Sequence, residues 1–478
     1  MRIQITISLF LATLLGCGAK SSNLAPAIAQ TQSWSESRQV TTARIISSTL
    51  QSNSSWTKME ELCDDIGHRL SGSPQLDIAI KWAVAALSAD GHENVHTEAV
   101  MVPKWVRGNE SAHMMKPLFR SLPMLGLGGS VGTPPAGITA PVEVVADEAA
   151  LERLGVGAKG RIVLFNNPMP AYDPVSGTGY GRTVRFRVNG ARLAAKHGAV
   201  AVLVRSVTAN SLRSPHTGGM HYGDAKNKIP AAAITVEDAE SIARLRARNR
   251  EVVVTLKMEA KNHGLVKSAN VIAEFNGRER PEEVVVIGGH LDSWDVGQGA
   301  HDDGTGVVAA MEALTVLRKL GLRPRRTIRV VLWTNEENGL RGGRQYAEDH
   351  KNELKHHVAA IESDSGCYGL RGFSVDLEDN ALEAHAKAQL QQLVARLKSL
   401  NATGVSTGWA GADISPMRKA GVPLLGMKTD VSTYFNIHHT HADTLDKVDP
   451  DKLSGCVAGM AVMAYLLAEM PGRLGDKE

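Results

Sequence analysis

The sequence predicts an α/β protein: a mostly parallel mixed sheet flanked by helices, with a smaller α/β domain inserted into it. Two observations lead to this prediction. From residue 261 onward, near-continuous apolar runs of strand length alternate with helical segments, which is the pattern of a parallel sheet covered on both faces. Between residues 137 and 260, a second and more compact set of apolar runs alternates with helical segments of its own.

The part of the chain before the inserted domain is predicted to be mainly helical and to end in a strand. Apolar residues recur at helical spacing on both sides of a Gly/Ser-containing turn within residues 57–91, which indicates a helix, a loop and a second helix. Residues 94–108 alternate and are rich in β-forming residues, so a strand is expected there. The Gly/Pro-rich stretch from Gly132 to Ala140 then marks a domain boundary.

The inserted domain and the second half of the large domain follow. Residues 190–198 and 237–249 are helical segments between short apolar strands, and a second boundary falls near Lys261 to Lys267. We therefore expect a signal segment and linker over residues 1–29, two parts of a large domain over 30–136 and 261–478, and an inserted domain over 137–260.

The N-terminus resembles an export signal. Arg2 precedes an apolar run from Ile3 to Leu15, which is too short for a membrane span and suits the core of a signal peptide. Two endings stay open. The first is lipidation at Cys17, in a lipobox-like Leu-Leu-Gly-Cys, and the second is simple cleavage after Ala29. Either ending predicts a periplasmic or extracellular protein, and the first adds a lipid anchor.

Charge and cysteine content exclude several classes of protein. The net charge of the 478 residues is only +3, and the chain has no dense Lys/Arg run, so nucleic acid is not an expected partner. If Cys17 carries lipid, three widely spaced cysteines remain, which do not describe a disulfide framework or a structural zinc site. We interpret Cys63, Cys367 and Cys456 as small buried apolar residues.

Metal-binding side chains follow the predicted strands at the points where the strands end. The strand ending at Ile287 leads to His290 and Asp292, the strand ending at Trp333 leads to Glu336 and Glu337, and the strand ending at Ile361 leads to Asp364. Ligands of open α/β sheets bind beyond the carboxyl ends of the strands. The pair Asp302-Asp303 opens a helix, and a His-rich loop at residues 438–441 comes later.

This set of side chains is what a site with two zinc ions needs. Zinc binds imidazole nitrogen and carboxylate oxygen, and two ions about 3.5–4 Å apart need a bridging carboxylate. Each piece alone has an ordinary explanation: Asp-Asp before a helix is commonly an N-cap, and a Glu-Glu pair commonly faces solvent. Their coincidence at one sheet edge favours a metal site, because unpaired charge at the end of a buried strand is costly.

Four stretches carry a resemblance to a known family. Residues 288–306, 331–343, 362–366 and 438–444 resemble the co-catalytic zinc exopeptidases of the aminopeptidase and glutamate-carboxypeptidase family. The resemblance covers nearly the whole mature chain, including Arg-Leu-Ser-Gly-Ser-Pro at residues 69–74 and Ser-Pro-His-Thr-Gly at residues 214–218. The inserted unit resembles a protease-associated domain.

The resemblance implies a role for each matching residue. It makes Glu336 the general base, Asp292 the acid that orients His290, and Asp413 a residue that contacts substrate or shapes the site; a structural Asp413 that caps a helix is the equal alternative. The oxyanion donor is His438 or Tyr434, and the choice stays open. His439 is preferred over His438 and His441 because it precedes the acid of Ala-Asp-Thr by four positions, as in the family. The implied ligands of two Zn²⁺ ions are His290, Asp302 as the bridge, Glu337, Asp364 and His439.

The implied activity is metal-dependent hydrolysis of short peptides, dipeptides with free termini above all, by a homodimer. An aminopeptidase of the same fold is the first alternative, because the pocket residues that choose between them are not readable from the sequence. Two further alternatives are a glutaminyl cyclase-like acyltransferase with one zinc and a non-catalytic binding protein, and the complete ligand set argues against both.

Overall fold

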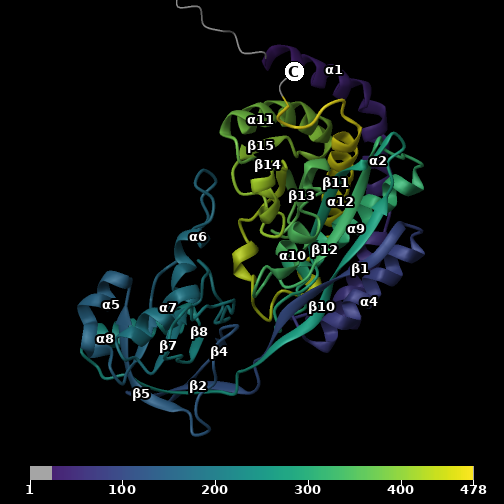
Figure 1. Cartoon of the computed structure of the whole chain (residues 1–478). Coiled ribbons are helices and arrows are strands. Elements are labelled where there is room, and N and C mark those ends of the chain that lie inside the picture. The colour runs from purple at the N-terminus through teal and green to yellow at the C-terminus, as the bar shows by residue number, and fades with distance from the viewer. Residues whose placement is uncertain (1–23, 477–478) are drawn as a thin grey trace, which may run out of the picture.

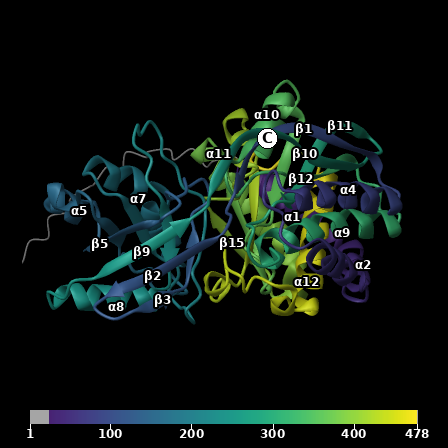
Figure 2. The same ribbon diagram turned by 90° about the horizontal axis from the view of Figure 1, so that it is seen from below.

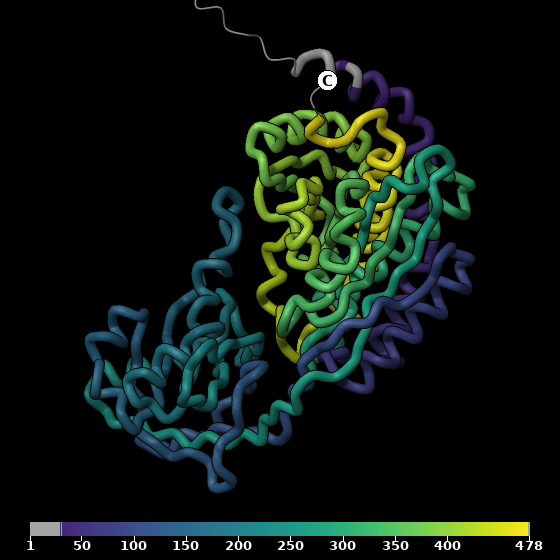
Figure 3. The backbone as a smooth tube through the Cα atoms, viewed as in Figure 1, coloured from purple at the N-terminus to yellow at the C-terminus, as the bar shows by residue number. Residues whose placement is uncertain are grey.

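The computed structural model describes residues 24–476, which form two lobes, each built on an eight-stranded sheet (Figure 1). The chain leaves the larger lobe after β1 (Glu93–Val106) and returns along β10 (Lys261–Phe275), as the tube in Figure 3 shows. These two strands pair antiparallel along most of their length and form the connection between the lobes. The predicted α/β class, with a mixed sheet flanked by helices, is confirmed.

The sheet of the larger lobe is parallel where its strands lead to the predicted metal-binding side chains. Its order is β1-β10-β12-β11-β13-β16-β14-β15. The four strands β12, β11, β13 and β16 are mutually parallel neighbours, and the outer pairs β10/β12 and β16/β14 are antiparallel. Their bounds are β11 Arg280–His290, β12 Arg326–Trp333, β13 His357–Glu362, β14 Leu370–Asp376, β15 Gly404–Thr407 and β16 Leu424–Thr429.

Two of these strands, β14 and β15, are not evident from the sequence. The first is interrupted by Arg371, Gly372 and Ser374, and the second is mostly exposed, so neither shows the continuous apolar run that marks the central strands. β14 pairs with β16 and buries most of its side chains, whereas the edge strand β15 depends on its pairing with β14 rather than on burial of its own side chains. This is why periodicity alone does not reveal them.

Helices cover both faces of the larger sheet. On one face, α9 (Thr305–Lys319) and α12 (Pro450–Glu469) pack on each other and on the sheet, with α2 (Gln39–Leu50) and α4 (Pro74–Ala89) beside them. On the other face, α10 (Arg341–Asp349) supports a smaller core around Trp333 and Tyr346. The remaining long helix, α11 (Asn380–Val394), packs on α1 (Leu24–Ser37) and β15.

Of the described helices, α12 is the one that is long and apolar enough to cross a membrane. In the fold, 83% of its most apolar window is buried. Its apolar residues face α9, α2 and the sheet, and a helix that is apolar all round is expected in such a core position. Its burial therefore explains its composition.

The smaller lobe extends from one side of the larger lobe, with β2 and β9 lying side by side (Figure 2). Its sheet has the order β3-β2-β9-β5-β6-β7-β8-β4, with α7 (Arg185–Lys196) and α8 (Val236–Ala247) packed on it. The strand bounds are β2 Glu110–Lys116, β3 Arg120–Leu122, β4 Met124–Gly126, β5 Ile138–Val145, β6 Ile162–Phe165, β7 Ala201–Arg205, β8 Ala231–Ile234 and β9 Val253–Met258.

The predicted start of the inserted domain at residue 137 is wrong. The sheet of the smaller lobe already begins at Glu110, because β2 pairs with β9 and β4 pairs with β8. The Gly/Pro-rich stretch, which the sequence suggests as a boundary, is a connection inside this lobe between β4 and β5. At the other end, β9 finishes at Met258 and β10 starts at Lys261.

The signal-like run and Cys17 lie outside the described residues, so the structure does not test export or lipidation. The other three cysteines, Cys63, Cys367 and Cys456, are buried and form no disulfide.

Candidate metal centre and catalytic site

Three neighbouring parallel strands bring the candidate ligands to one edge of the sheet. His290 is the last residue of β11 and lies in register with Trp333 at the end of β12. On the other side, Gly288 of β11 lies in register with Glu362 at the end of β13. Because parallel strands end at the same edge, His290, the Glu336-Glu337 loop and Asp364 converge there.

Five side chains meet at this edge, and Asp302 lies between the others. One carboxylate oxygen of Asp302 is 3.4 Å from Nε2 of His290, and the other is 3.2 Å from Nε2 of His439. The same His290 nitrogen is 3.4 Å from Oδ1 of Asp364. Oε2 of Glu337 is 3.0 Å from Nε2 of His439. The geometry therefore divides into two groups that share Asp302.

In the group formed by Asp302, His439 and Glu337, His438 is an alternative ligand to Glu337. Nε2 of His438 is 3.5 Å from Oδ2 of Asp302, so His438 also lies within reach of a cation held by Asp302 and His439. We favour Glu337 over His438 because its carboxylate lies 3.0 Å from Nε2 of His439 and because, within the described part of the chain, its Oε1 has no hydrogen-bond partner. The His438 ring instead stacks on His439, with a centroid distance of 3.6 Å.

Buried atoms without hydrogen-bond partners indicate that the site fits divalent cations. Nε2 of His290, Oδ2 of Asp302 and Oε1 of Glu337 are buried and accept or donate no hydrogen bond within the described structure. Buried polar atoms without partners are rare and costly, and here His290 and Asp302 belong to clusters whose ligand atoms lie within 4.8 Å of one another. Burial, together with the charge of Asp302, raises the pKa of Glu337 to about 7. Such crowding of carboxylates is relieved by bound cations.

Both histidines are oriented by backbone carbonyls. Nδ1 of His290 lies 2.9 Å from the carbonyl oxygen of Asp292, and Nδ1 of His439 lies 3.3 Å from the carbonyl oxygen of Thr217. A proton on each Nδ1 would donate to the carbonyl and leave the Nε2 lone pair free for a metal.

Asp292 orients His290 through its backbone carbonyl and not, as predicted, through its carboxylate. Its carboxylate is 3.9 Å from Nδ1 of His290, which is too far for a hydrogen bond, so the backbone carbonyl of Asp292 orients the imidazole. The carboxylate instead accepts the backbone N–H of Glu336 at 3.0 Å and that of Glu337 at 3.4 Å. Asp292 therefore holds the loop that carries Glu336 and Glu337.

The two aspartates at residues 302 and 303 have different tasks. Asp303 accepts the backbone N–H groups of His290 and Gly306, at 3.0 and 3.2 Å, and so caps the start of α9. A side chain at Gly289 would collide with this carboxylate, since a Cβ there would lie 2.3 Å from it. The N-cap interpretation thus applies to Asp303, while Asp302 faces the two histidines.

Asp443, the acid of Ala-Asp-Thr, fixes the backbone at Asp302. Its two carboxylate oxygens accept the backbone N–H groups of His301 and Asp302, at 2.8 and 3.1 Å. In the sequence, Asp443 serves only to identify His439, which precedes it by four positions. Its contact with Asp302 could not be foreseen, because it depends on how the loop folds back onto that residue.

The smaller lobe contacts the metal-site loop directly. The backbone N–H of Thr217 donates to the carbonyl of His439 at 3.0 Å, and Nδ1 of His216 lies 2.7 Å from the carbonyl of His438. These residues belong to Ser-Pro-His-Thr-Gly, which the sequence identifies as a matching stretch without a role. His439 adopts a φ of +61°, which these contacts support.

Of the remaining predicted site residues, three line a cavity and the fourth, Asp413, is buried away from it. Glu336, Tyr434 and His438 line a cavity of about 470 Å³ between the lobes, together with Asp302, Asp364 and Glu337. Burial raises the pKa of the Glu336 carboxyl well above its ordinary value; the charge of His290 opposes this and that of Asp364 adds to it. Asp413 is buried and does not line that cavity, and among residues 24–476 neither of its carboxylate oxygens has a hydrogen-bond partner. The short helix that follows it has no side-chain cap, and Asp413 lies close enough to Glu362, Glu336 and His290 for their charges to act on its pKa.

Arg69 is a supporting residue without an assigned role in the sequence analysis, although it starts the stretch Arg-Leu-Ser-Gly-Ser-Pro. Its fully buried guanidinium donates to four backbone carbonyls around the site, at 2.7–2.9 Å, belonging to Gly67, Leu291, Gln298 and Gly299. It therefore fixes both the segment after β11 and the segment before Asp302.

Replacing Arg69 with methionine should lower the free energy of unfolding by about 3 kcal/mol or more, because each buried carbonyl left without a donor costs about 1–3 kcal/mol. Urea unfolding of the purified variant measures this loss. Arg250→Met is the matched control, since Arg250 is exposed. A loss below about 1 kcal/mol for Arg69→Met would contradict the assigned role.

The chain is similar to known peptidases. A family model named "Peptidase family M28" matches residues 270–464. Carboxypeptidase Q of Mus musculus is 45% identical over 418 residues, which is 87% of this chain and 86% of that protein. The solved structure of a peptidase M28 precursor from Shewanella amazonensis SB2B has a TM-score of 0.86 at 35% identity, covering 92% of this chain and 98% of that one. An aminopeptidase from Aneurinibacillus sp. strain AM-1 shares the fold, with a TM-score of 0.64 at 21% identity, over 91% of this chain and 97% of that one.

Proposed function

The chain belongs to peptidase family M28, and from this premise we propose that it is a zinc-dependent exopeptidase that hydrolyses short peptides, dipeptides with free termini above all. The observation that carries the proposal is that His290 and His439 each lie against one oxygen of Asp302. Asp364 lies beside His290, and Glu337 lies beside His439. The similarity to carboxypeptidase Q, which is named as an enzyme that acts at the carboxyl end of a chain, supports the exopeptidase function.

We propose two Zn²⁺ ions per chain, with Asp302 as the bridge. His290 and Asp364 would complete one position, and Glu337 and His439 would complete the other. This mixture of imidazole and carboxylate ligands suits zinc, and three protein ligands at each position leave room for water and substrate. When bound, the two ions would lower the pKa of a water between them and polarise the scissile carbonyl.

Glu336 is the proposed general base. It follows the end of β12, its backbone is held by Asp292, and its side chain lines the cavity beside the ligands. It accepts the proton of the attacking water and passes it to the leaving amine, so its carboxyl must bind and release a proton within one turnover. A carboxyl whose pKa lies above its ordinary value is suited to hold that proton.

Tyr434 and His438 both remain candidates for the group that stabilises the tetrahedral oxyanion. Both line the cavity. Burial raises the pKa of Tyr434 well above its ordinary value, and the charges of Asp302 and Asp364 add to this, so its hydroxyl keeps its proton and can donate it in a hydrogen bond. Burial, together with His439, lowers the pKa of His438 well below its ordinary value, so a neutral imidazole would be the donor there.

A substrate panel tests the proposed function. Free dipeptides, N-blocked dipeptides and aminoacyl-nitroanilides are incubated with the enzyme, each with and without a chelator, and bound zinc is counted by elemental analysis. We expect chelator-sensitive cleavage of free dipeptides and two zinc ions per chain. Cleavage of the nitroanilides would instead show an aminopeptidase. One zinc ion with no hydrolysis of any member would favour a cyclase-like or binding function.

We also propose that the protein is exported, that the smaller lobe is a protease-associated-like domain, and that the chain forms a homodimer. Export rests on the apolar run from Ile3 to Leu15. The intact mass of the protein isolated from its native cells distinguishes a lipid-carrying chain that begins at Cys17 from one that begins after Ala29. Light scattering of the purified enzyme reports the mass of the assembly, and a monomeric mass would contradict the homodimer.

A further inference from the structure

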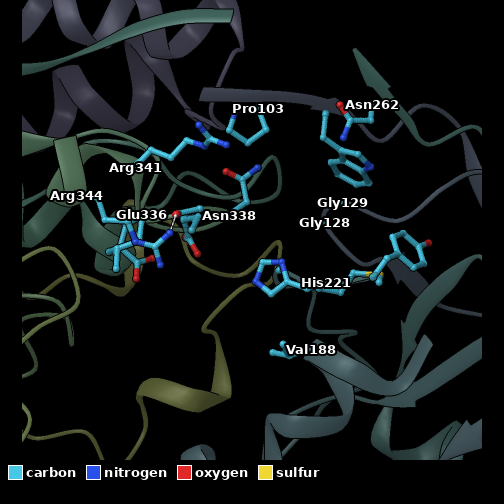
Figure 4. A pocket seen from close by; sticks show the side chains of 18 of the residues that line it. Pro103, Gly128, Gly129, Val188, His221, Asn262, Glu336, Asn338, Arg341 and Arg344 are labelled. Carbon is cyan, nitrogen blue, oxygen red and sulfur yellow. Dashed lines mark hydrogen bonds between the residues drawn. The ribbon is translucent and has the colours of Figure 1, made fainter. Parts of the chain in front are cut away.

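The smaller lobe reaches a proposed metal ligand beside a cavity of about 990 Å³ that lies between the lobes. Figure 4 shows two walls of this cavity: Glu336 of the larger lobe lies on one side, and His221 of the smaller lobe lies on the other. Next to it, the lobes touch at the metal-site loop, residues 434–441, which carries His439. The contacts at this loop are therefore a direct route from the smaller lobe to the metal centre.

Two consecutive backbone carbonyls of the metal-site loop are bound from the smaller lobe. The carbonyl of His438 lies 2.7 Å from Nδ1 of His216, and the carbonyl of His439 accepts the backbone N–H of Thr217 at 3.0 Å. Within residues 24–476, neither carbonyl has another hydrogen-bond donor. Because a carbonyl oxygen only accepts, Nδ1 of His216 carries the proton in this contact.

The same segment also orients the imidazole of His439. The carbonyl oxygen of Thr217 lies 3.3 Å from Nδ1 of that ring, while Nε2 of the ring faces Asp302 at 3.2 Å and Glu337 at 3.0 Å. The backbone of His439 has a φ of +61°, a conformation that persists where its surroundings fix it. The smaller lobe therefore fixes both the backbone and the ring of this ligand.

The segment that holds the loop is itself anchored to the sheet of the smaller lobe. The backbone N–H of His216 donates to Oγ of Ser206 at 2.8 Å, and that hydroxyl donates to the carbonyl of Ile234, at the end of β8, at 2.8 Å. Oγ1 of Thr217 donates to the carbonyl of Gly126, at the end of β4, at 2.7 Å. His216, Ser206 and Thr217 are all buried, so water does not replace these hydrogen bonds.

We propose that His216 is a positioning residue, through which the docking of the smaller lobe sets the zinc affinity of the position formed by Glu337 and His439. This inference rests on the proposed function and adds a regulatory link to it. Within the described chain, the hydrogen bonds of His290 and Asp364 stay inside the larger lobe, so the other zinc position depends far less on His216. Because coupling between sites is reciprocal, zinc beside His439 also stabilises the docked lobe.

Two substitutions at residue 216 test this coupling. His216→Leu removes the Nδ1 donor and keeps a side chain of similar size, whereas the amide of His216→Asn still offers an N–H. Competition with a zinc chelator measures both dissociation constants of each purified full-length protein. We expect His216→Leu to bind one ion as the unaltered enzyme does and the other about tenfold more weakly, and His216→Asn to recover most of that loss.

Two controls identify the ion that is affected. His221→Leu makes the same substitution at an exposed position five residues later and should keep both affinities. In Glu337→Gln, which already weakens the same zinc position, adding His216→Leu should change the affinity of the remaining ion by less than about twofold, because changes that act on one site are not additive. Equal affinities in His216→Leu and His221→Leu, or equal weakening of both ions in His216→Leu, would overturn the proposal.

Hydrogen exchange gives a second readout that does not depend on the number of ions. In the zinc-free proteins, the amides of the metal-site loop should exchange about tenfold faster in His216→Leu than in His221→Leu. Zinc should slow exchange of residues 214–219 in the unaltered enzyme, as reciprocal coupling requires. If the unaltered enzyme binds fewer than two zinc ions, the proposed metal centre fails. The exchange rates then still decide whether His216 holds the loop, and equal rates in the two variants contradict it.

Discussion

Replacing Glu336 with glutamine should lower kcat on a free dipeptide by about 10³-fold or more, while the zinc content stays at the level of the unaltered enzyme. General acid–base catalysis contributes about 10²–10⁴-fold, and the amide of glutamine cannot accept and return a proton. The backbone of residue 336 would keep its hydrogen bond to Asp292, so the loop should keep its position. Steady-state kinetics and elemental analysis of the same preparation measure both quantities.

Glu337→Gln is the matched control for this experiment. The two glutamates are adjacent, and both are held by Asp292, but only Glu337 contacts His439. We expect Glu337→Gln to lose zinc as well as turnover and to recover part of its activity when zinc is added in excess. Turnover near that of the unaltered enzyme in Glu336→Gln, or normal zinc content in Glu337→Gln, would contradict the roles assigned to the two glutamates.

Replacing Asp302 with asparagine should remove measurable peptidase activity and most of the bound zinc. Asp302 is the residue that both groups of ligands share, so the loss of its charge weakens both metal positions at once. An amide also offers one oxygen where the carboxylate offers two. Zinc content after dialysis, followed by activity with added zinc, measures the effect.

Asp303→Asn is the comparison that separates a metal ligand from an N-cap. Asp303 accepts two backbone N–H groups, and among residues 24–476 it forms no ion pair with a histidine. The oxygen of asparagine can accept such bonds. We expect this variant to keep its zinc. Equal zinc loss in Asp302→Asn and Asp303→Asn would show that the two residues do not have the different roles assigned to them.

The amino-acid sequence alone determined which residues gather at the active edge. Buried parallel strands appear as continuous apolar runs, and the rule that ligands bind beyond their carboxyl ends is independent of the details of packing. His290, Glu336, Glu337 and Asp364 can therefore be placed together from the order of the strands and the residues that follow them. The fold class follows from the same runs.

Other features could not be predicted because they depend on contacts between residues far apart in the chain. The sequence suggests that Asp292 orients His290 through its carboxylate, yet that carboxylate bonds the loop after β12, more than 40 positions away. The start of the smaller lobe at Glu110 depends on pairing between β2 and β9, which short strands with mixed burial do not reveal.

The tertiary structure also decided what the smaller lobe contributes. Arg187, His216 and Thr217 look like ordinary residues of an α/β unit in the sequence, and they reach the metal-site loop only because the two lobes close on each other. The sequence determined the chemistry that each strand end carries, because that is local; the partners, tautomers and neighbouring charges that tune it were decided by the way distant segments pack.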